Sequence, residues 1–425
     1  MRLNNILPLI ILVLFFSCNS NEVTDKKDYT NFITTKLDIT DLSTQTEILS
    51  NKIEAIPNQF TQMAKRASVY TRLFNATGDI SYLIKAENDL KAAIAITGRK
   101  FPSFLKGLAT NYISQHRFIE ALELLKEAEA NGEKLNGTKK MLFDVHLELG
   151  NYLAAESYLN DIRNTSDFDY LIRLAKWEDH KGNLDGAIEQ MEKATRIAES
   201  MNSKSLKQWS YTNLADFYGH AGDLKKSYNH YLKALDLDAN NAYAKKGIAW
   251  ILYSYENKPD EALHILDHIS TYYYAPDYDL LRAEIADYTN NTVLKSKALN
   301  NYKKAVSNPS YGDMYNKYNV MLYTEDFELT NLAIKIAEKE VANRPTPQSY
   351  DLLAWSYFKT GDIKKANAIV ETYVDGQTSE PEVLYHIAEI YKAVGKTDKI
   401  YDLKTELIAS IYELGPTMAS KIKQL

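Results

Sequence analysis

The sequence predicts an all-helical protein built as a solenoid of stacked helical hairpins. Apolar residues recur at helical spacing along most of the chain, and small residues mark one helix face at intervals of about 34 residues. The 425 residues include only 16 Gly and 10 Pro, too few for the many tight turns of an all-β protein of this length. A chain this long exceeds one ordinary compact domain, so it either divides or repeats.

The first element is an export signal over residues 1–17. Arg2 gives its positive start, and the apolar run from Ile6 to Phe16 is too short to span a bilayer but fits a signal core. The run ends beside Cys18, the only cysteine of the chain. Its surroundings resemble a bacterial lipobox, with Phe15 where leucine is usual. The resemblance implies that Cys18 carries a lipid; an ordinary secretory signal with an incidental cysteine is the alternative.

The second element is a polar stretch over residues 18–46, which we expect to form a lipidated, flexible tether. Acyl chains on Cys18 would anchor it stably, because each buried CH₂ contributes about 0.8 kcal/mol. Asn19, and not aspartate, follows the cysteine, which by resemblance to the sorting rule of enteric bacteria favours the outer membrane. We therefore expect an outer-membrane lipoprotein of the cell envelope that faces the periplasm or the cell surface.

The repeated unit is clearest over residues 205–240, where Gly222-Asp223 separates two amphipathic helices. Glycine suits the left-handed C-cap of the first helix, and aspartate can cap the second; Gly361-Asp362 repeats this pair. The apolar face of the unit is formed by Tyr211, Leu214, Ala215, Tyr218, Ser227, Tyr231 and Ala234. One hairpin cannot bury such a face alone, so neighbouring hairpins must stack.

The small residue of the first helix can be followed along the chain. It falls at Ala67, Ala109, Phe143, Ala175, Ala215, Ala249, Ala286, Met321, Ala354 and Ala388, with large residues in two degenerate copies. This spacing predicts about ten hairpins. A Tyr-rich turn before Pro276 favours dividing them into an N-terminal array over residues 47–270 and a C-terminal array over residues 271–425 that ends in a capping helix.

The pattern resembles the tetratricopeptide repeat (TPR), with its small residue at position 8 and Tyr, Gly and Ala at later fixed positions. The resemblance implies an α-solenoid wound as a right-handed superhelix, here within a bacterial TPR lipoprotein. It also implies that positions 2, 5, 9, 12 and 13 of each repeat line the concave surface. In the middle repeats these positions include Lys176, Asp179, His180, Asp216, Gly219 and His220.

The same positions of the last two repeats give the candidate groove-binding residues Asp351, Trp355, Phe358, Lys359, Tyr385, Glu389 and Lys392. Exposed there, the rigid aromatic side chains would anchor a protein partner. The alternative is that they pack against the neighbouring repeat.

The sequence shows no evident grouping of catalytic or metal-binding side chains. His264 and His268 have a metal-chelating spacing on a helix, but a third ligand and the glutamate of a zinc-protease helix are missing. The net charge of −6 gives no basic face for nucleic acid. We expect no enzyme activity, no cofactor and no bound metal.

These observations predict a lipid-anchored TPR scaffold that mediates protein–protein interactions in the bacterial cell envelope, with a protein or peptide partner. The alternative is a carbohydrate-binding or exopolysaccharide-export accessory lipoprotein. Such lipoproteins also contain these repeats, and the 31 Tyr could stack on sugar rings.

Overall fold

Ten antiparallel helical hairpins make up most of the described chain. The computed structural model describes residues 22–425, so the predicted signal at 1–17 and Cys18 lie outside the described residues. Within them the regular structure is helical throughout, with no strand. The hairpins are α3 (Phe60–Thr77) with α4 (Ile80–Thr97), α5 (Pro102–Ser114) with α6 (Phe118–Ala130), α7 (Leu135–Glu148) with α8 (Tyr152–Asp161), α9 (Phe168–His180) with α10 (Leu184–Ser200), α11 (Lys204–His220) with α12 (Leu224–Leu237), α13 (Ala242–Trp250) with α14 (Pro259–Ile269), α15 (Asp277–Tyr288) with α16 (Thr292–Val306), α17 (Asn316–Thr324) with α18 (Thr330–Asn343), α19 (Pro347–Lys359) with α20 (Ile363–Ile369), and α21 (Pro381–Ala393) with α22 (Thr397–Ala409). The predicted fold class and the count of about ten hairpins are confirmed.

The remaining elements are short or lie at the ends of the chain. They are α1 (Lys26–Thr30), η1 (Phe32–Thr34), α2 (Thr40–Ala55), η3 (Pro309–Tyr311), α23 (Ile411–Leu414) and α24 (Met418–Gln424), with π turns η2 (Ile251–Tyr255) and η4 (Val370–Val374) that extend α13 and α20. Among residues 22–425, none of the helices is both long and apolar enough to cross a bilayer.

The alanines at position 8 lie in the core of their hairpins. Ala109, Ala215 and Ala354 are fully buried, because a larger side chain would push the two helices apart. In one degenerate repeat, Phe143 is equally buried and packs edge-on against Trp177. The degenerate copies therefore keep the hairpin by rearranging its packing.

The predicted caps are present at the hairpin turns. Gly222 and Gly361 have φ of 75° and 88°, the left-handed conformation that ends a helix. The Oδ1 atoms of Asp223 and Asp362 each accept a hydrogen bond of 3.1 Å from a backbone N–H in the first turn of the next helix. Local sequence thus ends one helix and begins the next.

Tyrosine joins the hairpin core to its surface. Tyr211 and Tyr231 are buried, while their hydroxyls donate to Glu199 and Asp216 at 2.8 and 2.5 Å. The same use recurs in Tyr158–Glu129, Tyr218–Glu192, Tyr357–Glu338 and Tyr391–Asp375. Tyr suits a thin solenoid because its ring fills the core and its polar end reaches a surface carboxylate.

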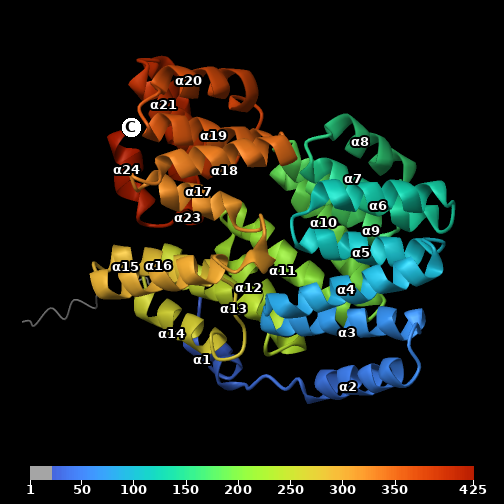
Figure 1. Cartoon of the computed structure of the whole chain (residues 1–425). Coiled ribbons are helices and arrows are strands. Elements are labelled where there is room, and N and C mark those ends of the chain that lie inside the picture. The colour runs from blue at the N-terminus through green and yellow to red at the C-terminus, as the bar shows by residue number, and fades with distance from the viewer. Residues whose placement is uncertain (1–21) are drawn as a thin grey trace, which may run out of the picture.

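The solenoid closes on itself. In Figure 1 the stack α3–α10 lies on one side and α17–α24 on the other, with α11 between them. Arg344 Nη1 lies 3.3 Å from Glu148 Oε2, and Tyr274 N–H donates to Thr77 O at 2.9 Å. The turn at residues 270–276 separates α14 from α15, where we drew the boundary between the two arrays. That division stays a prediction.

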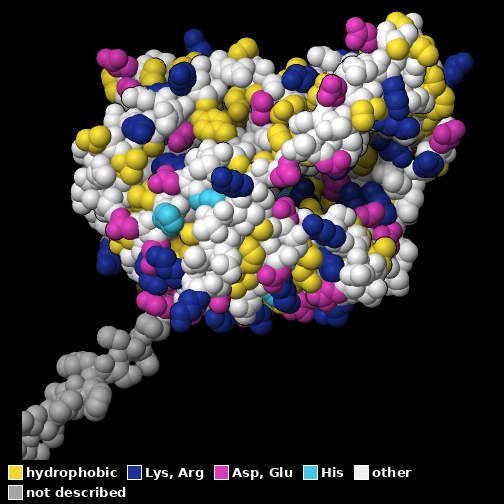
Figure 2. Space-filling view, turned by 90° about the horizontal axis from the view of Figure 1, so that it is seen from below, with side chains coloured by type: hydrophobic (Ala, Val, Ile, Leu, Met, Phe, Trp, Pro, Cys, Tyr) yellow, Lys and Arg dark blue, Asp and Glu magenta, His cyan; other side chains and the backbone are white. Residues whose placement is uncertain are grey.

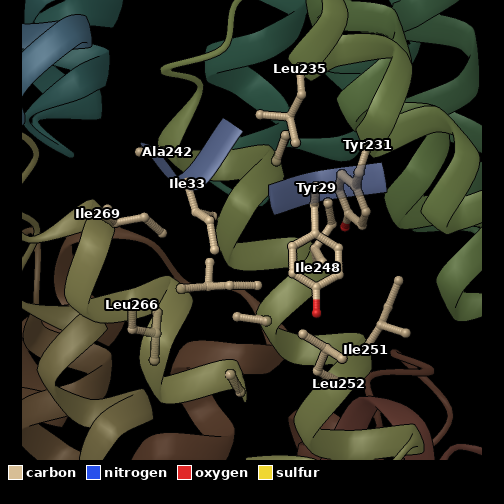
Figure 3. Close-up of a cluster of buried hydrophobic side chains, with 14 of the residues drawn as sticks. Tyr29, Ile33, Tyr231, Leu235, Ala242, Ile248, Ile251, Leu252, Leu266 and Ile269 are labelled. Carbon is tan, nitrogen blue, oxygen red and sulfur yellow. The ribbon is translucent and has the colours of Figure 1, made fainter. Parts of the chain in front are cut away.

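The expectation of a flexible tether is wrong for the described part of residues 18–46. Residues 22–37, here called the strap, include α1 and η1, and α2 already begins at Thr40. Tyr29 and Ile33 are 2% and 8% exposed and point between the helices α12–α14 (Figure 3). The mean polarity of this stretch concealed two apolar residues four positions apart, which is one helical turn.

Polar contacts also hold the strap. The Glu256 carboxylate is fully buried and accepts hydrogen bonds from the backbone N–H groups of Val23 and Thr24 at 2.7 and 2.8 Å. The Thr24 hydroxyl donates to the same carboxylate at 2.8 Å. The Tyr29 hydroxyl donates to Glu261 at 2.8 Å. The strap is therefore an integral part of the fold.

Candidate functional site

The seven predicted groove residues lie on α19 and α21, but their aromatic members are not exposed. Trp355 and Tyr385 are only 6% and 9% exposed. The Trp355 ring stacks on His386 with centroids 4.0 Å apart, and Phe358 lies 5.1 Å from Trp355. Of the two alternatives, exposure in the groove and packing against the neighbouring repeat, these contacts correspond to the second.

The polar members of this set are also engaged within the chain. Asp351 is buried and lies 2.8 Å from His386 Nδ1, and burial raises the pKa of this carboxyl despite the histidine. Lys359 pairs with Glu325 at 3.0 Å, and Lys392 donates to the Gln424 carbonyl at 2.5 Å. Tyr385 donates to Glu389 at 3.2 Å. A binding role for this set stays a prediction.

The open concave space lies in the middle of the molecule. It is a chamber of about 570 Å³ between the α7–α11 repeats and the C-terminal repeats. Its walls include Glu148, Tyr152, Lys176, Asp179, His180, His220, Arg344, Gln348, Ser379, Glu380, Glu406 and Glu413. Lys176, Asp179, His180 and His220 are concave positions given by the repeat pattern, which therefore identified one wall.

Most of the opposite wall was missed. Arg344, Ser379 and Glu406 come from loops and helices of the C-terminal repeats, brought there by the closure of the superhelix. No local pattern could have found them, because their position depends on contacts such as Arg344–Glu148 between distant repeats.

The chamber is acidic. Five carboxylates line it, against one lysine, one arginine and two histidines. Glu148 lies 2.8 Å from Lys176 and 3.3 Å from Arg344; burial alone would raise its pKa, but these two cations hold the pKa below its usual value. Asp179 has its pKa raised, because burial and the nearby Glu380 and Glu413 outweigh the attraction of His220. The site therefore favours cationic groups in a ligand.

His268, one of the two spaced histidines, lies beside a buried lysine. His268 Nε2 lies 3.0 Å from the Nζ of Lys245, which is only 1% exposed. Burial lowers the pKa of Lys245 to about 8 and that of His268 to about 4. Across residues 22–425, no cluster of three or more His, Cys, Asp or Glu is arranged to hold a metal ion.

Comparison with known proteins identifies one repeat by sequence. Residues 210–241 match the tetratricopeptide repeat family. No curated protein matches the chain.

Solved structures also resemble the chain. One is a tetratricopeptide repeat protein from Parabacteroides merdae, 17% identical, covering 55% of this chain and 92% of that chain with a TM-score of 0.38. Another is Pseudomonas aeruginosa pilF, 13% identical, covering 50% and 96% with a TM-score of 0.37. A third is yeast Tom70, 14% identical, covering 94% and 95% with a TM-score of 0.37.

Proposed function

We propose that this tetratricopeptide-repeat solenoid is a lipid-anchored, non-enzymatic scaffold of a bacterial cell envelope that binds a polypeptide in its central chamber. The observation that carries the proposal is the chamber itself. One of its walls is built from the concave positions of consecutive repeats. Its carboxylates and amide side chains suit the backbone and basic side chains of a protein segment.

The face of the molecule seen in Figure 2 carries charges of both signs. Figure 2 shows Lys and Arg side chains intermingled with Asp and Glu over one face of the molecule, with hydrophobic side chains in small groups. A strongly basic face for nucleic acid is absent from that view. Several of the tyrosines that suggested a carbohydrate ligand instead connect core and surface, as in Tyr211–Glu199 and Tyr231–Asp216.

The strap defines how a lipid on Cys18 would hold the protein. Cys18 precedes Glu22 by four residues, which span at most about 14 Å. A free tether from residue 18 to 46 would reach up to about 95 Å. Because Glu256 holds Val23 and Thr24, the anchored protein would lie close to the membrane with its α12–α14 edge nearest the lipid.

Site-specific photocrosslinking in the native envelope tests the chamber. A photoreactive residue at Lys176 or His180 is expected to crosslink to a protein partner, while one at Glu189, exposed on α10 outside the chamber, is not. Equal crosslinking from all three positions, or none from the chamber, would contradict the proposal.

A further inference from the structure

The C-terminal segment of the chain, residues 411–417, occupies part of the concave surface. It comprises α23 and the turn before α24, and α23 contacts α11, η2 and α21. Trp250 and Ser254 hold it from positions 9 and 13 of their repeat, and Gly219 and His220 from positions 12 and 13 of theirs. These are the positions at which the repeat pattern places a ligand.

The backbone of the segment is held by two side chains. The carbonyl oxygen of Tyr412 accepts a hydrogen bond from Trp250 Nε1 at 3.0 Å and another from Ser254 Oγ at 2.6 Å. Two donors on one carbonyl fix the segment in both position and direction. Because they bind the backbone of the helical turn α23, these two hydrogen bonds do not depend on the side chain of residue 412.

The side chains of the segment are recognised individually. The Tyr412 ring lies against Gly219, where a Cβ would come within 3.2 Å of its Cε1 atom. The Glu413 carboxylate lies 2.5 Å from His220 Nδ1. The surface therefore accepts an aromatic residue followed by an acidic one.

Glycine is required three residues after the tyrosine. Gly415 has a φ of 80°, and a Cβ there would lie 2.6 Å from Glu284 Oε1 and 3.2 Å from the Trp250 ring. Thr417 then donates to Glu284 at 3.4 Å. These contacts define the pattern Tyr-acid-x-Gly, in which x is Leu414, a residue that packs against the C-terminal core.

We propose that the surface formed by Gly219, His220, Trp250, Ser254 and Glu284 is a peptide-binding site that residues 411–417 fill as an internal ligand. Its external ligand is a polypeptide segment with the pattern Tyr-Glu/Asp-x-Gly, which displaces the internal one. This inference rests on the proposed scaffold function and names the chemistry of its partner.

The internal ligand lies between two elements that are held by contacts of their own. On one side α22 ends at Ala409, and on the other α24 is held independently: Ile422 is 1% exposed, and Lys404 donates to the Lys423 carbonyl at 3.0 Å. Tyr412 is partly exposed, and the Glu413 side chain is 20% exposed. Ile411 and Leu414 pack against the C-terminal core, so residues 410–417 must give up these contacts when they move out between the two fixed ends.

The covalent link sets the strength of the competition. A segment on a short tether acts at an effective concentration on the order of millimolar. A free peptide of the same sequence therefore binds the intact protein only at comparable concentrations, and weakening the internal ligand should raise its affinity.

Fluorescence polarisation with a labelled peptide of residues 408–419 tests the inference on the full mature chain. The double variant Tyr412→Ala/Glu413→Gln is expected to bind the peptide at least about tenfold more tightly than the wild type, because its internal competitor is weakened. Adding Trp250→Phe should then weaken binding about five- to tenfold through loss of one hydrogen bond. Trp209→Phe, at an exposed tryptophan elsewhere on α11, is the matched control and should change nothing.

A second measurement does not depend on the variant folding. With millimolar peptide, hydrogen exchange of the wild-type protein should accelerate over residues 410–417 and stay unchanged over α24. Equal peptide affinity for wild type and folded double variant, equal binding of a peptide with Gly415→Ala, or unchanged exchange over residues 410–417 would overturn the inference. His220 and Glu413 also line the chamber, so the two sites adjoin. The crosslinks from Lys176 and His180 report on partner binding in the chamber and the peptide measurements report on residues 411–417, so either idea can fail alone.

Discussion

Removing the Tyr29 side chain should release the strap. The ring is 2% exposed and packs in the cluster of Ile248, Ile251 and Leu252, and its hydroxyl donates to Glu261. Deleting a buried large aromatic side chain typically costs about 3–5 kcal/mol. The strap can undock from the array as a unit, so the protein need not keep the cavity that loss of the Tyr29 ring would leave. Tyr29→Ala should therefore act mainly on strap docking.

The size of the effect follows from this free energy. Each 1.4 kcal/mol or so changes an equilibrium tenfold, so the undocked population should rise roughly 10²- to 10³-fold. Native-state hydrogen exchange reads this population directly. Protection of the backbone N–H groups of Val23 and Thr24 should fall by that factor, while protection in α19 and α21 stays unchanged.

Two controls make the experiment specific. Tyr29→Phe keeps the ring and loses only the hydrogen bond to Glu261, so protection should fall about tenfold. Tyr401→Ala removes a tyrosine that is 78% exposed and should leave the strap unaffected. The reasoning is refuted if Tyr29→Ala lowers strap protection less than threefold, which is about 0.7 kcal/mol, or if all regions lose protection equally.

Three further results are expected. Burial would raise the pKa of Glu256, but hydrogen bonds from Thr24 and Val23 and the Lys258 ammonium hold that pKa below its usual value. The ionised carboxylate therefore stabilises strap docking above the unfolded pKa of 4.5, and the strap should lose protection as the pH falls through the folded pKa. Glu256→Gln should abolish this pH dependence in hydrogen exchange. Trp355→Ala should lower the free energy of unfolding by about 3–5 kcal/mol in urea titrations, because the ring is buried; an unchanged midpoint with selective loss of partner binding would instead support an exposed anchor. Cys18→Ser should move the protein from the membrane to the soluble fraction on sedimentation, and continued membrane association would contradict lipid anchoring.

The sequence was informative wherever the structure depends on local pattern. Small residues such as Ala215 and Ala354 located the hairpins, and Gly222-Asp223 located a turn and its cap, because each acts within one or two helical turns. The concave positions Lys176 and His220 were placed correctly for the same reason.

The rest depends on how distant parts of the chain meet. Trp355 occupies a concave position, yet it is covered because His386 of the next repeat stacks on it. The chamber's second wall arises from closure, through pairs such as Arg344–Glu148 that no repeat encodes. The strap was missed because Tyr29 and Ile33 are isolated in a polar stretch and find their partners more than 200 residues away.

The central claim is tested most directly by the affinity of chamber variants for the partner that crosslinking identifies. Asp179→Lys and Glu406→Lys reverse charge inside the chamber, and Glu189→Lys makes the same change on an exposed position of α10 outside it. If the chamber binds the partner, both chamber variants should raise the Kd at least about tenfold, the effect of about 1.4 kcal/mol, while the control leaves it unchanged. An unchanged Kd for both chamber variants, or an equal rise in the control, would contradict binding in the chamber.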